Sequence, residues 1–301
     1  MIFNTISGRR RAQKILVLLV SIVVLLYLLA PIYWVVVSSF QKEIALQDRP
    51  PHYFPSADVF TTNHYSFIFT GVIPPDSTIM LQSMYTMRGT LVYPAIINSI
   101  MIASIVTLIN VVVGFPAAHI FARYRFWGDR KVFLLLLATR LLPSISIVVA
   151  MYILLLRLDL LDTKLALVGI YSAITLPFTI WILRAYFHNI PVEFEEAARL
   201  DGCRYIRMMT KVVVPLAKPG LIAAAIFAFM ASYGEFVFAT ILTQTIQSQT
   251  QTAVLASLSQ GMSTSRGMIA AAATLSILPP LLLAIVFRKH ILEGLTARLG
   301  L

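Results

Sequence analysis

The chain alternates between long apolar stretches and shorter polar ones. A helix needs about 20 mostly apolar residues to cross a bilayer, and six stretches have that length. They cover approximately residues 15–38, 93–121, 132–156, 166–187, 219–243 and 267–288. The pattern therefore predicts an all-α membrane protein with six transmembrane helices.

The first apolar stretch follows a cluster of four basic residues between positions 9 and 14. A cleavable signal peptide has an apolar core of only about 7–15 residues. The apolar run of residues 15–37 is longer than that. We therefore expect an uncleaved first transmembrane helix.

The polar stretches give the expected domain organisation. A cytoplasmic N-tail (1–14) and the first transmembrane helix (15–38) precede an external loop (39–92). A five-helix core (93–288) and a cytoplasmic C-tail (289–301) follow. The external loop is rich in proline and aromatic residues. It can either cover the outer helix ends or offer a docking surface to an external partner.

The charge of the chain fits this organisation. Only 12% of the residues are charged and 58% are hydrophobic, yet the net charge is +11. A strongly basic chain can bind nucleic acid, but membrane proteins also concentrate Lys and Arg in their cytoplasmic loops. With the N-terminus inside, seventeen of the 24 basic residues lie in predicted cytoplasmic segments. This asymmetry explains the charge without nucleic acid and predicts that both termini are cytoplasmic.

Residues that carry chemistry are sparse. Cys203 is the one cysteine, which excludes an internal disulfide and a cysteine metal cluster. The sequence has no phosphate-binding GxxxxGK[ST] loop and no catalytic motif, so we expect a non-enzyme that binds no metal. The histidines show no pair at metal-ligand spacing and are interpreted as ordinary loop or interface residues. They are His52, His64, His119, His188 and His290.

The predicted cytoplasmic segment 189–218 does not have the composition of a solvated loop. Asn189 is a suitable helix cap, and Pro191 suits a first helical turn. The glutamates at positions 193, 195 and 196 favour the positive end of the helix dipole. Gly202 suits the position just after the helix end, where glycine adopts a positive φ at low cost.

A second short helix is expected over residues 204–213, ended by Pro215 and Pro219. The first helix is acidic at its start and carries small side chains in its middle. A helix lying on a membrane surface would carry lysines and larger apolar anchors instead. The segment therefore predicts a socket for another protein at the cytoplasmic face.

The same segment resembles a known motif. The string EEAARLDG is followed, after nine further residues, by Val212, Val214 and Pro215, which is similar to the EAA motif of ABC importer permeases. Other strings extend the resemblance to the MalG-type permeases of carbohydrate uptake over nearly the whole chain. They are Asn98-Ser99, HIFARYRF (119–126), YFHNIPVEFEEAARLDG (186–202) and ILEGLTARLGL (291–301).

The resemblance implies the type I ABC importer permease fold and a permease subunit of an ATP-driven, binding-protein-dependent importer. The expected solute is a carbohydrate, either a sugar or an oligosaccharide. A polyol, a glycerol-phosphate compound and an acidic sugar are the alternatives. The implied partners are a sister permease subunit in the inner membrane, two cytoplasmic ATPase subunits and an external substrate-binding protein. ATP and Mg would be bound by the partner ATPase, and this chain would bind no cofactor.

In that family the EAA helix couples the permease to the ATPase. The glutamate that matches Glu196 anchors this coupling helix, and the glycine that matches Gly202 makes its turn. The resemblance assigns the coupling role to seven residues. They are Glu195, Glu196, Ala197, Ala198, Leu200, Asp201 and Gly202.

Polar residues inside the predicted spans are candidates for a substrate path, because a charge in a span costs a few kcal/mol or more. Pro143 suggests a helix break close to Arg140. Arg140 can either grip hydroxyls or a carboxylate of the solute or pair with structural groups. Glu235 would likewise need a partner, and Arg140 is one option. The candidate path residues are Arg140, Ser144, Tyr233 and Glu235.

Two departures from the family pattern concern the solute. Tyr233-Gly234-Glu235-Phe236 stands where many relatives have Trp-Asn-Glu-Phe, and the stretch 70–92 is longer than expected. The polar external segment 243–265 resembles the loop that reaches into the binding protein, although a solvated connector has the same composition. Its amide side chains could replace hydrogen bonds of a sugar. They are Gln244, Gln247, Gln249 and Gln251.

Two other classes of protein compete with the importer. A membrane enzyme would need paired acids or a metal site, and Asp159 and Asp162 on a short outer turn are the one close pair. A passive channel would not need an acidic, small-residue socket facing the cytosol. Both alternatives are therefore less consistent with the segment 189–218.

Overall fold

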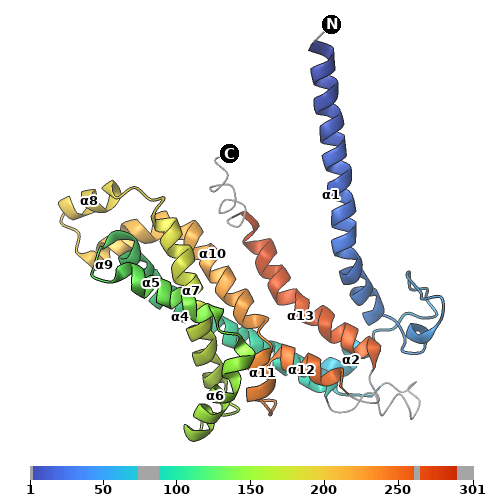
Figure 1. Cartoon of the computed structure of the whole chain (residues 1–301). Coiled ribbons are helices and arrows are strands. Elements are labelled where there is room, and N and C mark those ends of the chain that lie inside the picture. Colours follow the sequence, from blue (N-terminus) through green and yellow to red (C-terminus); the bar gives the residue numbers. More distant parts are fainter. Residues whose placement is uncertain (1–2, 74–87, 261–264, 290–301) are drawn as a thin grey trace. The chain divides into compact units, whose positions relative to one another are not determined.

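The computed structural model describes residues 3–73, 88–260 and 265–289, and this part of the chain is helical (Figure 1). Its one β-contact is a bridge between Gln41 and Phe60. The helices are α1 (Phe3–Ser39), α2 (Asn63–Thr70), α4 (Val92–Arg123), α5 (Asp129–Ala138), α6 (Ser144–Arg157), α7 (Lys164–Phe187), α8 (Glu193–Leu200), α9 (Tyr205–Met208), α10 (Val214–Tyr233), α11 (Val237–Leu242), α12 (Gln251–Leu258) and α13 (Arg266–Val286).

The expectation of an all-α protein with six membrane spans is confirmed. Within the described residues, five helices are long and apolar enough to cross a bilayer, and a bent helix pair can supply a sixth span. The five are Gln13–Ser39, Gly89–Arg123, Lys164–Phe187, Tyr205–Tyr233 and Arg266–Val286. The bent pair is Asp129–Leu141 with Ser144–Arg157.

The chain divides into two compact units. Unit 1 contains the chain up to Thr90 together with Leu258–Leu275, and unit 2 contains Leu91–Ser257 together with the chain from Ser276 onward. Helix α13 therefore begins in unit 1 and ends in unit 2. The C-terminal string at 291–301 and part of the long external loop, 74–87, lie outside the described residues.

Unit 1 packs part of the external loop against the start of α13. The buried carboxylate of Glu43 accepts hydrogen bonds from the backbone N–H groups of Arg266 and Gly267, both at 3.0 Å, and from the Ser265 hydroxyl at 2.7 Å. These N–H groups have no partner within their own helix, so the carboxylate satisfies them. His64 of α2 is buried and donates from Nε2 to the Gln41 carbonyl. Its burial corrects the expectation that the histidines are ordinary loop or interface residues.

Unit 2 is built around α4, α7 and α10, which pack along one another. Small residues allow these helices to approach closely, as is usual in membranes. A Cβ atom added at Gly220 of α10 would lie 2.4 Å from Cγ of Tyr186 in α7. Aromatic and aliphatic side chains fill the end of the unit that carries α8 and α9, among them Phe115, Leu183 and Phe187.

Two predicted spans are broken helices. The chain bends by 93° between α5 and α6, because Pro143 disfavours helical geometry at Leu142, which is extended. This confirms the break expected from Pro143. The predicted fifth span, 219–243, extends too far at its C-terminal end. Its helix, α10, ends at Tyr233, and the separate helix α11 begins at Val237.

The second cytoplasmic helix also differs from its prediction. We expected a helix over residues 204–213 that Pro215 and Pro219 would end, but α9 leads through a π-helical turn, Met209–Val213, directly into α10. Pro215 lies in the first turn of α10, where its missing N–H is not needed. Pro219 lies inside α10.

We predict that Gly220→Ala destabilises unit 2 by about 1–3 kcal/mol, because the added methyl group overlaps the root of the Tyr186 ring. Gly169→Ala is the matched control, since a Cβ atom at this glycine of α7 meets no atom within 4 Å. Thermal unfolding of the purified variants in detergent measures the difference. Equal midpoints for both variants would contradict the close contact between α10 and α7.

Candidate functional site

Helix α8 forms the first part of the predicted cytoplasmic socket and lies at one end of unit 2 (Figure 1). All three glutamates lie in its first turn, as predicted, where negative charge favours the positive end of the helix dipole. The predicted cap is wrong, because Val192 is the residue before the helix and no side chain caps it. Gly202 has φ +78° and ends the turn as expected, because other residues adopt this conformation at higher cost.

The seven residues assigned to coupling, of which Asp201 and Gly202 follow α8, differ in burial. Glu195 and Ala198 are buried inside the chain, at 2% and 6% exposure, and one helical turn separates them. The other five are exposed, and Leu200 is 89% exposed. In this structure Glu195 and Ala198 therefore face the interior of unit 2, so any part they have in coupling acts through other residues of this chain and not by direct contact with another protein.

Glu195 binds the end of α4 with both carboxylate oxygens. Nε of Arg123 donates to Oε1 at 2.7 Å, and Nε2 of His119 lies 3.0 Å from Oε2. Because an ionised carboxylate only accepts hydrogen bonds, Nε2 of His119 carries a proton. His119 is fully buried, and Arg123 has 12% of its side chain exposed. We call Glu195, His119 and Arg123 the α4–α8 cluster.

The chain on both sides of α8 also contacts the α4–α8 cluster. Nη2 of Arg123 donates to the carbonyl of Ile190 at 2.8 Å, ahead of the helix. The hydroxyl of Tyr205, which follows the helix, lies 3.3 Å from Nδ1 of His119. A buried charge is costly unless it is paired and hydrogen-bonded, and these contacts supply the partners of both ions.

Sequence reasoning missed His119 and Arg123. Both belong to a string that carried the family resemblance, but neither was given a role, and His119 was interpreted as an ordinary loop or interface residue. The available signal was their spacing of four residues at the end of an apolar run, which puts both side chains on one helix face. Nothing in the string indicates which acid they bind.

The candidate path residues in the fifth span have structural partners. Glu235 accepts hydrogen bonds from the N–H groups of Val237, Phe238 and Ala239 and so caps α11. Tyr233 is buried and donates to the carbonyl of Ser276 at 3.0 Å. The suggested pairing of Arg140 with Glu235 is not formed, which corrects that option.

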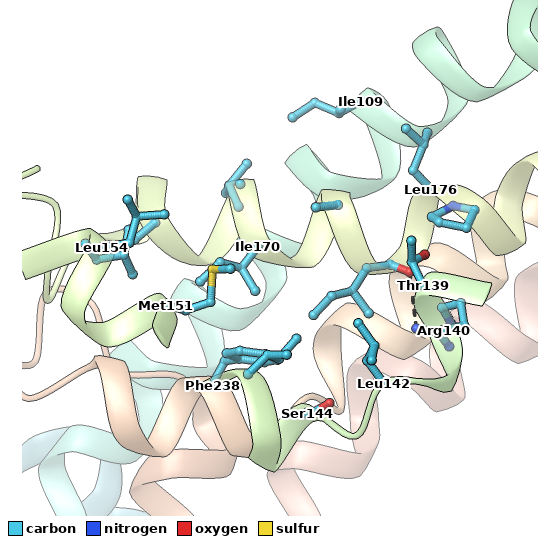
Figure 2. Close-up of a pocket in the computed structure, with 18 of the residues that line it drawn as sticks. Ile109, Thr139, Arg140, Leu142, Ser144, Met151, Leu154, Ile170, Leu176 and Phe238 are labelled. Carbon is cyan, nitrogen blue, oxygen red and sulfur yellow. Dashed lines mark hydrogen bonds between the residues drawn. The ribbon is translucent and has the colours of Figure 1, made fainter. Parts of the chain in front are cut away.

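Arg140 lies beside a cavity of about 1150 Å³ in unit 2. Figure 2 shows Thr139 and Arg140 at one end of the cavity and Leu154 with Met151 towards the other. Nη1 of Arg140 donates to the carbonyl of Ile174 at 3.2 Å. The lining is mostly apolar, and Ser144 also contributes to it. Arg140 thus has one structural partner and an exposed side chain.

The polar loop before α12 is held in place by two side chains. Oδ1 of Asp162 accepts hydrogen bonds from the N–H groups of Gln244 and Thr245 and from the hydroxyl of Ser248. Asn98 donates from Nδ2 to the carbonyls of Ile246 and Gln249. The loop is therefore not a freely solvated connector.

The four amide residues of this loop differ in exposure. Gln244 and Gln247 are exposed, and Gln249 is half-buried. Gln251 is buried at the start of α12, where Nε2 donates to the Tyr233 carbonyl. This corrects its assignment to a loop that contacts a binding protein. Asp162 also has a structural role, so the acid pair that a membrane enzyme would need is not free.

Comparison with known proteins identifies the family. Residues 110–296 match the family described as binding-protein-dependent transport system inner membrane component. The chain belongs to this family. It is thus a multi-pass inner-membrane subunit of a transport system, as predicted, and not a membrane enzyme or a passive channel.

Several relatives in this family are similar over nearly their whole length. The trehalose/maltose transport system permease protein MalG of Thermococcus litoralis is 31% identical over 95% of this chain and 96% of its own. The trehalose transport system permease protein SugB of Mycobacterium tuberculosis is 33% identical over 96% and 98%. The sulfoquinovosyl glycerol transport system permease protein SmoH of Agrobacterium fabrum is 28% identical over 89% and 87%.

The permease fold also matches a solved structure. The chain superposes on a chain of a bacterial ABC transporter involved in importing the acidic polysaccharide alginate, with a TM-score of 0.71 and 18% identity. The match covers 93% of this chain and 97% of the other. The expected ABC importer permease fold is therefore confirmed.

We predict that Asp162→Asn loosens the loop before α12. Hydrogen bonds to a charged acceptor contribute about 1.5–3 kcal/mol, so the amides of Gln244 and Thr245 should exchange with solvent on the order of tenfold faster. Asp159→Asn is the matched control, because Asp159 lies in the same turn and, like Asp162, has a positive φ. Hydrogen-exchange mass spectrometry measures both, and equal exchange would contradict the bonding to Asp162.

The same loop should respond to acid. Burial alone would raise the pKa of Asp162, but the hydrogen bonds from Gln244, Ser248 and Thr245 lower it below the ordinary value of 3.8. A carboxyl group with a lowered pKa stabilises the folded state fully above its ordinary pKa and loses this effect as the pH falls through the folded value. Protection of the Gln244 and Thr245 amides from exchange should therefore persist down to pH 4 and decrease below it. The Asp162→Asn variant should show no such decrease.

Proposed function

We propose that this permease subunit imports a carbohydrate, either a sugar or an oligosaccharide, across the inner membrane. The observation that carries the proposal is the 31% identity to a trehalose/maltose permease over 95% of the chain. The trehalose permease of Mycobacterium tuberculosis is 33% identical to this chain. A maltodextrin permease of Bacillus subtilis is 32% identical over 66% of the chain. The sulfoquinovosyl glycerol permease supports an acidic sugar or sugar glycerol as the second candidate.

The subunit depends on an ATPase and on an external binding protein, as its family description implies. The sequence has no phosphate-binding loop, so ATP and Mg bind to the ATPase. We assign the ATPase contact to the exposed face of α8, which carries Glu196 and Leu200, and to the exposed Gly202 that follows the helix. A sister permease and two copies of the ATPase complete the importer, with both termini of this chain in the cytoplasm.

The cavity beside Arg140 is the part of this chain that we assign to the solute path. The Arg140 guanidinium and the Ser144 hydroxyl can donate hydrogen bonds to sugar hydroxyls, and the Thr139 hydroxyl, which donates to the Leu136 carbonyl, can accept one. The remaining lining is apolar and can contact the apolar faces of a sugar ring. Tyr233 and Glu235 are not included, because both are engaged in structural hydrogen bonds.

Transport requires that the spans have two packings whose balance depends on the state of the ATPase. A movement at the exposed face of α8 must therefore reach α4, α7 and α10. The external binding protein delivers the solute on the other side, where Gln244 and Gln247 of the loop before α12 are exposed. Their amide groups can exchange hydrogen bonds with a sugar without adding charge.

We predict that a carbohydrate stimulates ATP hydrolysis by the reconstituted importer. The complex of this chain, its sister permease, the ATPase and the binding protein is placed in liposomes and tested with trehalose, maltose, maltodextrin, glycerol phosphate and an amino acid. Hydrolysis should rise with one of the first three solutes. Stimulation by the amino acid alone would contradict a carbohydrate importer, and stimulation by glycerol phosphate alone would support that alternative.

We predict that Glu196→Lys releases the ATPase from the permease, because it reverses a charge on the exposed face of α8. Reversal of one charge in a complementary interface costs several kcal/mol. Glu193→Lys is the matched control, since it makes the same exchange at an exposed position of the same helical turn. Co-purification of the ATPase with each tagged permease measures the effect. Equal recovery from both would contradict the assignment of Glu196.

A further inference from the structure

Helix α8 is joined to the spans by the chain on both sides of it and by its side-chain contacts. Among the described residues, Glu195 is the one side chain of α8 that forms an ion pair, and both of its oxygens bind α4. Arg199 also reaches α4's end, but its 3.3 Å bond to the Tyr124 hydroxyl lies at the surface, where such contacts contribute little. The strongest polar link between α8 and the spans is therefore Glu195.

The geometry of this link restricts rotation as well as separation. His119 and Arg123 lie four residues apart on one face of α4, and each holds a different oxygen of the same carboxylate. A carboxylate held at both oxygens cannot turn about its own axis without losing one bond. Inside a protein the low dielectric makes each of these bonds electrostatically stronger than it would be in water.

The link also includes the chain on both sides of α8. Arg123 holds the carbonyl of Ile190 before the helix, and His119 lies against the hydroxyl of Tyr205 after it. Residues before, within and after α8 thus all contact the end of α4. We propose that Glu195 is the positioning residue through which a displacement of α8 is passed to α4. This inference rests on the proposed function of α8 in binding the ATPase.

The two glutamates then have separate tasks. Glu196 on the exposed face contacts the ATPase, and Glu195 on the buried face connects α8 to the membrane helices. A buried ion pair is seldom the most stabilising choice, since apolar groups of similar volume often do as well. Its value here is that it fixes one orientation of α8 on α4. Loss of Glu195 should therefore separate ATP hydrolysis from transport without releasing the ATPase.

The test uses the complete importer reconstituted in liposomes. Four permease variants are compared with the unaltered chain: Glu195→Gln, Glu195→Ala, Glu195→Asp and, as the matched control on the exposed side of the same turn, Glu193→Gln. For each, we measure the recovered ATPase, the rate of ATP hydrolysis and the solute transported per ATP. The variants are assayed only as assembled complexes, so a misfolded fraction does not enter the ratio.

The expected result is a loss of coupling. Glu195→Gln and Glu195→Ala should retain the ATPase, while the solute transported per ATP falls about tenfold, a usual size for coupling between two sites. Glu195→Asp keeps the charge and should recover part of the ratio, and Glu193→Gln should leave it unchanged. An unaltered ratio in both Glu195→Gln and Glu195→Ala would overturn the inference, as would loss of the ATPase from them.

A distance measurement tests the link directly. Spin labels are attached through Trp127→Cys, just beyond α4, and Glu193→Cys on α8, both at exposed positions, in a Cys203→Ser background. The distance between them should stay constant when ATP binds, and it should change or broaden when Glu195→Gln is added. A distance that changes equally with and without Glu195→Gln would overturn the inference.

These outcomes separate the two proposals. If the chain does not carry a carbohydrate, the unaltered complex shows no stimulation by any carbohydrate, whatever happens at Glu195. If Glu195 is not a positioning residue, the unaltered complex works and the Glu195 variants work equally well. The spin-label measurement can be made without knowing which solute is carried, because only ATP is added.

Discussion

The hydrocarbon region of a bilayer contains no water to bind backbone groups, so each N–H and C=O of a span needs a partner within the protein. Unit 2 has two helix breaks, one at Pro143 and one after Tyr233. At each break a charged side chain binds the backbone. Arg140 donates to a carbonyl of α7, and Glu235 accepts from the first N–H groups of α11. The charge of Glu235 is thus explained by the helix break beside it, whereas Arg140 binds the backbone of a neighbouring helix and keeps an exposed side chain.

The same requirement governs the inner end of α4, where the buried groups are themselves charged. The carboxylate of Glu195 needs donors because it has left water, and the guanidinium of Arg123 needs acceptors for the same reason. Each satisfies the other, and the remaining bonds go to His119 and to the Ile190 carbonyl. An apolar contact of equal area would allow the helices to slide, whereas these bonds form in one arrangement.

Hydropathy was sufficient to predict the spans, because a bilayer imposes their length and composition. It could not predict that the fifth span ends at Tyr233, because the apolar residues continue to Leu242. Glu235 was interpreted as a charge in need of a distant partner, although its partners are the N–H groups of the next turn. Pro143 did indicate its break. Pro215 was misleading, because proline breaks a helix when it lies in the interior but is tolerated in the first turn. The π-helical turn before it leaves no signal in the sequence.

Helix α8 shows which part of a site can be predicted from a motif. The string EEAARLDG identifies the helix and its turn, but it contains two adjacent glutamates that point about 100° apart. Packing decides between them, since Glu195 shares the buried face with Ala198, and Glu196 shares the exposed face with Leu200. Leu200 is 89% exposed and lies one turn after Glu196 on this face. Of the two glutamates, Glu196 and not the buried Glu195 is therefore the acid that a partner protein at this face can reach.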